Sequence, residues 1–162
     1  MSGEEAAILA AFAGILIIIG LIILVVAVIL YILMGIGLFK IAKREGKGDI
    51  AWMAWVPIVN MFLLTQLVEQ DVHESMRGKF TLIYGLAFAA SVALYFFIPF
   101  IGFILSVLQI YGFYFIIQRY SKNVTLHLVL VIITGMAAMP IQLFMFRNRE
   151  PIDIGDNIVF TE

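Results

Sequence analysis

A run without a single charged side chain, Ala6–Phe39, constrains the fold of this chain more than any other feature. As one straight helix it would be about 50 Å long, because an α-helix rises about 1.5 Å per residue. The hydrocarbon core of a lipid bilayer is only about 30 Å thick. The run is therefore predicted to be a membrane-crossing helix that tilts or extends beyond the lipid, with Gly35 and Gly37 marking where it could bend.

Composition supports a membrane protein. Of the 162 residues, 64% are hydrophobic and 13% are charged, whereas soluble domains are about half apolar and about a quarter charged. The chain carries Glu4 and Glu5 where a cleaved signal peptide carries positive charge, so we expect the first segment to be retained. The chain has no cysteine, which excludes disulfides and thiolate chemistry. Its net charge of −1 gives no reason to expect nucleic-acid binding.

Three later segments are also apolar enough to be predicted as spans: Phe80–Ile98, Phe100–Ile117 and Thr125–Phe146. The shorter segment Trp52–Val68 is interrupted by Pro57, which suits an interfacial or re-entrant helix. The sequence therefore predicts an all-α, polytopic transmembrane bundle over residues 1–146. It has four spans plus the proline-broken helix, or five spans if that segment crosses. Residues 147–162 are predicted to form a polar tail.

The positive charges predict an orientation, because Lys and Arg in short loops favour the cytoplasmic side. If Trp52–Val68 does not cross, eight basic residues share one side and only Arg147 and Arg149 lie on the other. If the segment crosses, the division is six to four. The first arrangement is better supported. It predicts a multi-pass protein of the plasma membrane with an extracellular N-terminus and C-terminus.

Three prolines, Pro57, Pro99 and Pro140, recur at separations of 42 and 41 residues. A duplicated helical hairpin would produce such a period. Spans of equal length with prolines at their ends would also produce it, and this second explanation is the simpler one.

Small residues recur at every fourth position in two predicted spans: Ala6, Ala10 and Gly14 in the first, and Gly85, Ala89 and Ala93 in the second. Such rows let helix backbones approach closely, which is a main source of attraction between helices in lipid. We expect the rows to pack the bundle internally. The first helix is long enough that its row could instead contact another membrane protein or a second copy.

Four basic residues follow the first apolar run at spacings that place them on one helical face: Lys40, Lys43, Arg44 and Lys47. They are predicted to anchor the helix at the membrane surface and to contact anionic lipids. Trp52 and Trp55 come next and are predicted to lie in the interfacial aromatic belt.

Pro57 lacks an N–H and clashes with the preceding helical turn, so it leaves backbone carbonyls that need partners in lipid. It is predicted to form a fixed elbow, with Asn60 as a donor one turn later. Gln109 lies near the centre of its span, and Gln142 lies near the end of the last span. An interhelical hydrogen bond is the simplest explanation of Gln109, and a polar pocket or path lined by these amides is the alternative.

Catalytic signals are weak. No ionisable residue lies in the middle of a predicted span, which argues against a pump, an ion-coupled transporter or an intramembrane protease. Glu69 and His73 are four residues apart, but on a helix Asp71 and Glu74 would point elsewhere, so we expect no metal site. We predict no catalytic residue and no cofactor.

The segment "GIGLFKIAKREGKGDIAWMAWVPIVNMFLL" resembles a group of uncharacterised small polytopic membrane proteins of Gram-positive bacteria, which carry a GLxKIAKxxGxxxAWxAWxPIxN pattern. The resemblance implies a polytopic plasma-membrane protein and supplies no catalytic residue. Leu64, Thr65 and Gln66 stand where the group carries a glycine. The residues that match are Gly37, Leu38, Lys40, Ala42, Lys43, Gly46, Ala51, Trp52, Trp55, Pro57, Ile58, Asn60, Pro99, Gly102, Arg147, Asn148 and Pro151.

These features favour a non-enzymatic integral membrane protein that is an accessory, assembly or immunity-type partner of a larger membrane complex. One alternative is a small channel or carrier with a path lined by Asn60, Gln109 and Gln142. A weaker alternative is a membrane enzyme that acts on lipid headgroups at a cytoplasmic surface containing Glu69, His73 and Glu74.

Overall fold

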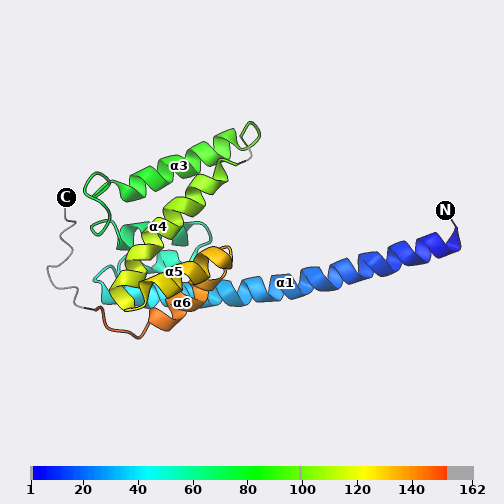
Figure 1. The fold of residues 1–162 in the computed structure, drawn as a ribbon, viewed down its shortest axis with the longest axis horizontal. Coiled ribbons are helices and arrows are strands. Elements are labelled where there is room, and N and C mark those ends of the chain that lie inside the picture. Colours follow the sequence, from blue (N-terminus) through cyan, green and yellow to red (C-terminus); the bar gives the residue numbers. More distant parts are fainter. Residues whose placement is uncertain (1, 99, 153–162) are drawn as a thin grey trace.

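The computed structural model describes residues 2–98 and 100–152, which form six α-helices and one 3-10 helix and contain no strand. The prediction of an all-helical fold is confirmed for this part of the chain. Figure 1 shows the later helices gathered around the C-terminal end of α1, while the N-terminal part of α1 extends alone. The elements are α1 (Gly3–Arg44), η1 (Ala51–Trp55), α2 (Val59–Leu67), α3 (Phe80–Leu94), α4 (Gly102–Tyr120), α5 (Val124–Ile133) and α6 (Ala138–Phe146).

Helix α1 has two parts with different surroundings. Residues 3–29, here called the stem, are exposed along almost their whole length. Residues 31–44, here called the docked segment, pack mainly against α6 and η1. The helix begins with a capping box, because the Ser2 side chain accepts from the Glu5 N–H and the Glu5 carboxylate accepts from the Ser2 N–H. It ends at Arg44, and Gly46 follows with a φ of 75°, the left-handed conformation that glycine adopts readily after a helix.

The expected bend at Gly35 and Gly37 does not occur, because α1 continues through both residues to Arg44. Their role is close packing instead. A Cβ atom on Gly37 would lie 2.6 Å from the carbonyl carbon of Leu143 in α6, and one on Gly35 would lie 2.9 Å from the Trp55 ring. The missing side chains let α6 and η1 approach the α1 backbone directly.

The segment predicted as the last span, Thr125–Phe146, is not one helix. Helix α5 ends at Ile133 and α6 begins at Ala138, and both Gly135 and Met136 have positive φ between them. The Thr134 hydroxyl donates to the Leu130 carbonyl, and the Met136 N–H donates to the Val131 carbonyl across the helix end. Each helix is only about 15 Å long or less, so the pair turns back as a hairpin.

The proline-broken segment also reverses direction. Helix η1 leads to Pro57, and α2 then returns toward the end of α1, where the Lys47 ammonium donates to the Gln66 carbonyl. Helix α2 has nine residues and is about 14 Å long, too short to cross a bilayer. The five-span alternative is therefore not supported, and the predicted break at Pro57 is observed.

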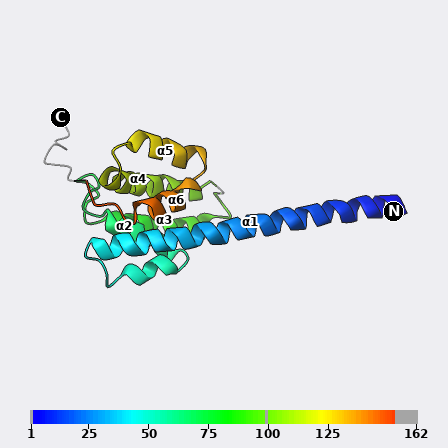
Figure 2. The same ribbon diagram turned by 90° about the horizontal axis from the view of Figure 1, so that it is seen from below.

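Four spans are not supported. Among the described residues, only α1 and α4 are both long and apolar enough to cross a membrane. Helix α3, predicted as part of a full span, has 15 residues and is about 22 Å long. Figure 2 shows that α3 and α4, like α5 and α6, form hairpins that open toward the same end of the bundle.

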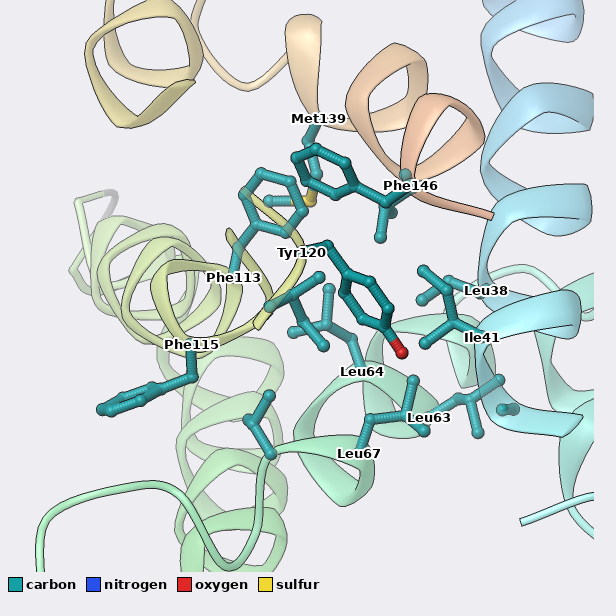
Figure 3. Packing of buried hydrophobic residues seen from close by; sticks show 14 of the residues in the cluster. Leu38, Ile41, Leu63, Leu64, Leu67, Phe113, Phe115, Tyr120, Met139 and Phe146 are labelled. Atoms are coloured by element: carbon teal, nitrogen blue, oxygen red, sulfur yellow. The ribbon is translucent and has the colours of Figure 1, made fainter. Parts of the chain in front are cut away.

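The core lies where the docked segment of α1, α2, α4 and α6 meet. Figure 3 shows the Tyr120 side chain pointing into this core between residues of α1 and α2. The Tyr120 ring stacks on Phe146 of α6, with ring centroids 6.2 Å apart. The largest fully buried apolar neighbours are Leu38, Ile41, Leu63, Leu64, Phe113, Ile116 and Leu143.

Candidate functional site

The charged side chains gather at one end of the bundle, here called the charged end. At this end α1, α2, α4 and α6 finish and α3 and α5 begin. The Arg44 guanidinium donates to the carbonyls of Arg147, at 2.7 Å, and Arg149. Because α6 returns, Arg147 and Arg149 lie beside the other basic residues. The predicted eight-to-two division of basic residues is therefore wrong, since all ten lie at the charged end.

Arg119, in the last turn of α4, is the centre of an ion-pair cluster. Its guanidinium forms ion pairs with Glu45, just after α1, and with Asp71, in the loop after α2. The Tyr120 hydroxyl donates to the same Glu45 carboxylate at 2.8 Å. These contacts, here called the Arg119 cluster, join the ends of three helices.

The segment after α6 is also bound to this cluster. The Ile152 N–H donates to the Arg119 carbonyl at 2.8 Å, and the Arg149 guanidinium donates to the Tyr120 carbonyl at 3.2 Å. The predicted polar tail thus begins as an ordered strap over residues 147–152. Residues 153–162, including the strand-like end of the sequence, lie outside the described part of the chain.

Burial raises the pKa of the Asp71 carboxyl above its ordinary value, and the neighbouring Arg119 charge opposes this rise only in part. Sequence reasoning missed the cluster, because Glu45, Asp71 and Arg119 are far apart along the chain. The only signal was that each lies near the end of a helix.

The predicted basic face is divided between two roles. Lys40 and Lys43 are exposed, and the Lys43 ammonium lies 4.5 Å from the centre of the Phe39 ring. Arg44 and Lys47 are partly buried and donate to backbone carbonyls of the strap and of α2. Only the first two remain exposed with no carbonyl partner among the described residues.

The small-residue rows do not pack the bundle as a pair. Ala6 and Ala10 are exposed, and nothing lies within 4 Å of the position of a Cβ atom on Gly14. In α3, a Cβ atom on Gly85 would lie 3.5 Å from the Phe62 ring, whereas Ala89 and Ala93 are exposed. The row in the stem therefore has no partner within the described residues.

At the elbow, backbone carbonyls do find partners. The Tyr31 hydroxyl of α1 donates to the Trp55 carbonyl at 2.6 Å. The residue after Pro57, Ile58, has a φ of 70°, which is strained for a β-branched side chain. Trp52 and Trp55 are both exposed at the surface of this element.

The three amides are buried in different ways. The Gln142 side chain donates to the His127 carbonyl at 3.1 Å and so links α6 to α5. The Asn60 amide lies 3.9 Å from the Met34 sulfur. Gln109 is 2% exposed, and neither polar atom of its side chain has a hydrogen-bond partner among the described residues. The interhelical hydrogen bond expected for Gln109 is not observed, and no described contact joins the three amides into one pocket.

Glu69 and His73 do not share a helical face, since α2 ends at Leu67. The Glu69 carboxylate accepts from the backbone N–H and the hydroxyl of Thr81, and the His73 ring contacts Ser75 at 3.0 Å. Within residues 2–98 and 100–152, no three acidic or histidine side chains are grouped as a metal site.

No protein-family model, curated protein or solved structure matches this chain. The resemblance to small Gram-positive membrane proteins stays a prediction, and function is argued from the geometry.

Proposed function

We propose that this protein is a non-enzymatic integral membrane protein that acts as an accessory, assembly or immunity-type partner of a larger membrane complex. The stem is the observation that carries the proposal. Its residues are apolar and exposed, and the most apolar window of α1 has no buried residue. An exposed apolar surface of this extent indicates a membrane or protein interaction site.

The stem fits a bilayer in length and in the chemistry of its ends. Residues 6–29 would be about 36 Å long, which suits a hydrocarbon core of about 30 Å crossed with a tilt. Glu4 and Glu5 lie at one end, and the bonded pair of Tyr31 and Trp55 lies at the other. Aromatic residues at this position are typical of a membrane interface.

The charged end supports an orientation. All ten basic residues lie there, and none lies beyond the stem. In place of four crossings, we propose a plasma-membrane protein whose stem crosses once, with its N-terminus outside and the charged end in the cytoplasm. The exposed residues Lys40 and Lys43 would contact anionic lipids.

The row of Ala6, Ala10 and Gly14 supports lateral contact of the stem with a second membrane protein, because it has no partner within the described chain. The chain has no native cysteine, so Ala10→Cys and Gly14→Cys can be crosslinked specifically in native membranes. Ile19→Cys, on the opposite face of the stem, is the matched control.

We expect a crosslinked product with Ala10→Cys and with Gly14→Cys, and little crosslinked product with Ile19→Cys. If the variants with cysteine at positions 10, 14 and 19 all remain monomeric after crosslinking, the proposed role as a partner of another membrane protein is contradicted. An intact mass of the mature protein that lacks the whole N-terminal segment through the stem would contradict the proposal as a whole, since the stem would then be a removed signal sequence.

A small channel or carrier is the second candidate function, and it is favoured by buried amides with unpartnered atoms. Such atoms occur in Asn60, Gln109 and Gln142, and a buried amide without a partner costs about 1–3 kcal/mol. A solute path would give these atoms partners. Solute flux through the purified protein in liposomes should then fall when Gln109 is replaced by Leu. Unchanged solute flux would remove the main support for this candidate function.

A further inference from the structure

The turn between α3 and α4 carries the most exposed aromatic side chains of the bundle. Phe96, Phe97 and Phe100 are 92%, 82% and 84% exposed. No charged residue occurs between Lys79 and Arg119. These aromatic residues, with Tyr95 and Phe103, are here called the hairpin tip.

The hairpin tip lies at the opposite end of the bundle from the charged end. Figures 1 and 2 both place it on the side toward the N-terminus of α1, level with the middle of that helix along its axis and well short of its N-terminal end; Figure 1 shows it set apart from α1. The turn between α5 and α6 points the same way, and Ile132 and Ile133 are exposed there. The apolar turns and the stem therefore point toward the same end of the molecule, opposite the charged end.

Part of the backbone of the tip is paired within the turn, as lipid requires of polar groups. The N–H groups of Phe97 and Ile98 both donate to the Leu94 carbonyl, at 2.9 and 2.8 Å. The Phe103 N–H donates to the Phe100 carbonyl at 3.0 Å. The turn thus satisfies these groups locally while its rings face outward.

We infer that the hairpin tip inserts among the acyl chains of the cytoplasmic leaflet beside the stem, as a re-entrant hairpin that does not cross the bilayer. The inference rests on the proposed crossing by the stem. If the stem reaches the outer surface near Glu4, a tip that extends only to the level of the middle of α1 stays within the membrane. Helix α3 agrees with this, since at about 22 Å it is shorter than the hydrocarbon core of about 30 Å. Helix α4 is long enough to be a candidate span, but it returns from the tip to the charged end where α3 begins.

The favoured ligand is lipid rather than protein. The exposed residues of the tip carry no charge, and the tip extends toward the same end of the molecule as the stem, whose length matches a bilayer. Aromatic rings of this kind are favoured at the membrane interface and just below it. A protein partner and a full crossing are the two outcomes that a test must separate.

The test uses the full-length chain in sealed membrane vesicles, with single cysteines labelled by the fluorophore NBD. Phe97→Cys reports on the tip, and Phe96→Cys is a second position in case the first variant folds poorly. Glu74→Cys marks the loop at the charged end, and Ile18→Cys marks the stem. The vesicles contain phosphatidylcholine, phosphatidylglycerol and nitroxide-labelled lipid, and they are prepared in both orientations.

We expect NBD at position 97 or 96 to lose most of its emission to nitroxide lipid and to resist aqueous dithionite from either side. NBD at position 74 should be quenched by dithionite from one side only. Dithionite reaching the tip from the side opposite position 74 would show a full crossing and overturn the inference. Shielding from both dithionite and nitroxide lipid would show a protein cover and would also overturn it.

Dithionite reaching the tip from the same side as position 74 would show a tip in water, which overturns the inference as well. NBD at position 18 distinguishes failure of this inference from failure of the proposed membrane crossing by the stem. If position 18 is quenched by nitroxide lipid while the tip is not, the stem still crosses and only the inference fails. If position 18 reacts with dithionite, the proposed crossing fails too.

Discussion

The stem and the docked segment belong to one continuous helix, yet they have opposite surroundings. Around Gly14 nothing lies within 4 Å of a Cβ position, whereas at Gly37 a Cβ atom would meet the α6 backbone at 2.6 Å. Both segments are apolar through Phe39, so hydrophobicity does not distinguish them. The difference arises because only the docked segment meets folded-back helices, and it shows that a small residue acquires its role from what lies opposite.

Adding one methyl group to each segment gives the sharpest test of this comparison. Gly37→Ala should lower the free energy of unfolding by about 3 kcal/mol, because the new Cβ atom would overlap the backbone at Leu143. Gly14→Ala should be neutral or stabilising by up to about 1 kcal/mol, since alanine favours helix and meets nothing there. Thermal unfolding in detergent micelles, followed by circular dichroism, measures both. Equal effects would mean that the two segments do not differ as described.

Removing the centre of the Arg119 cluster should have the next largest effect. Breaking a buried ion pair costs about 3–5 kcal/mol, and the partial exposure of this cluster reduces our expectation for Arg119→Met to about 2 kcal/mol. The exposed Lys122→Met variant removes a nearby charge and should change stability by less than about 0.5 kcal/mol. A similar loss of stability in Arg119→Met and Lys122→Met would show that net charge, rather than the specific ion pairs of Arg119, determines this stability.

The Tyr31 hydroxyl forms a hydrogen bond at the boundary between the stem and the docked segment. Tyr31→Phe removes its hydrogen bond to the Trp55 carbonyl and should cost about 1 kcal/mol. Tyr95→Phe, at the exposed hairpin tip, is the matched control and should be neutral. Chemical denaturation of both variants in the same micelles is the measurement. A neutral Tyr31→Phe would place the boundary of the packed region elsewhere.

Substitution of Asp71 should change the free energy of unfolding least, and the change should depend on pH. Burial raises its pKa in the folded state above the ordinary value of 3.8, so folding favours the protonated form. The stabilisation is fully present below that ordinary pKa and is lost as the pH rises through the folded pKa. Arg119, Glu45 and Lys47 are the charged groups that act on it.

Unfolding of the wild type and Asp71→Asn should therefore be compared between about pH 3 and 7. The stability of the wild type relative to the variant should fall with rising pH, and at pH 7 the variant should differ by about 0.5 kcal/mol or less, as for other partly exposed ion pairs. A wild type that gains relative stability with rising pH would show that the Arg119 pair, rather than burial, controls this carboxyl.

Local features of the fold were predictable where their causes lie close together in the sequence. The charge-free run became α1, and Pro57 separates η1 from α2 as a break. The turn after Ile133 also has a local cause, since Thr134 and Gly135 can end a helix. Apolar residues on both sides concealed that signal, and the error changed the predicted side of the C-terminal segment.

The candidate site was predictable only in part. The buried positions of Asn60, Gln109 and Gln142 agree with their choice as polar residues inside the bundle. The division of the basic face between exposed Lys40 and hydrogen-bonded Arg44 depends on the strap, which no local pattern indicated.

By itself, the sequence determined that this chain is helical and that it contains an apolar helix longer than a bilayer is thick. It did so because an uninterrupted apolar run and the absence of charge are properties of neighbouring residues. Only the tertiary structure decided which part of α1 is packed, that Glu45, Asp71 and Arg119 meet, and that every basic residue lies at one end. The physical reason is that these relations join distant residues through the packing of folded-back helices, and uniform apolar composition leaves that packing open.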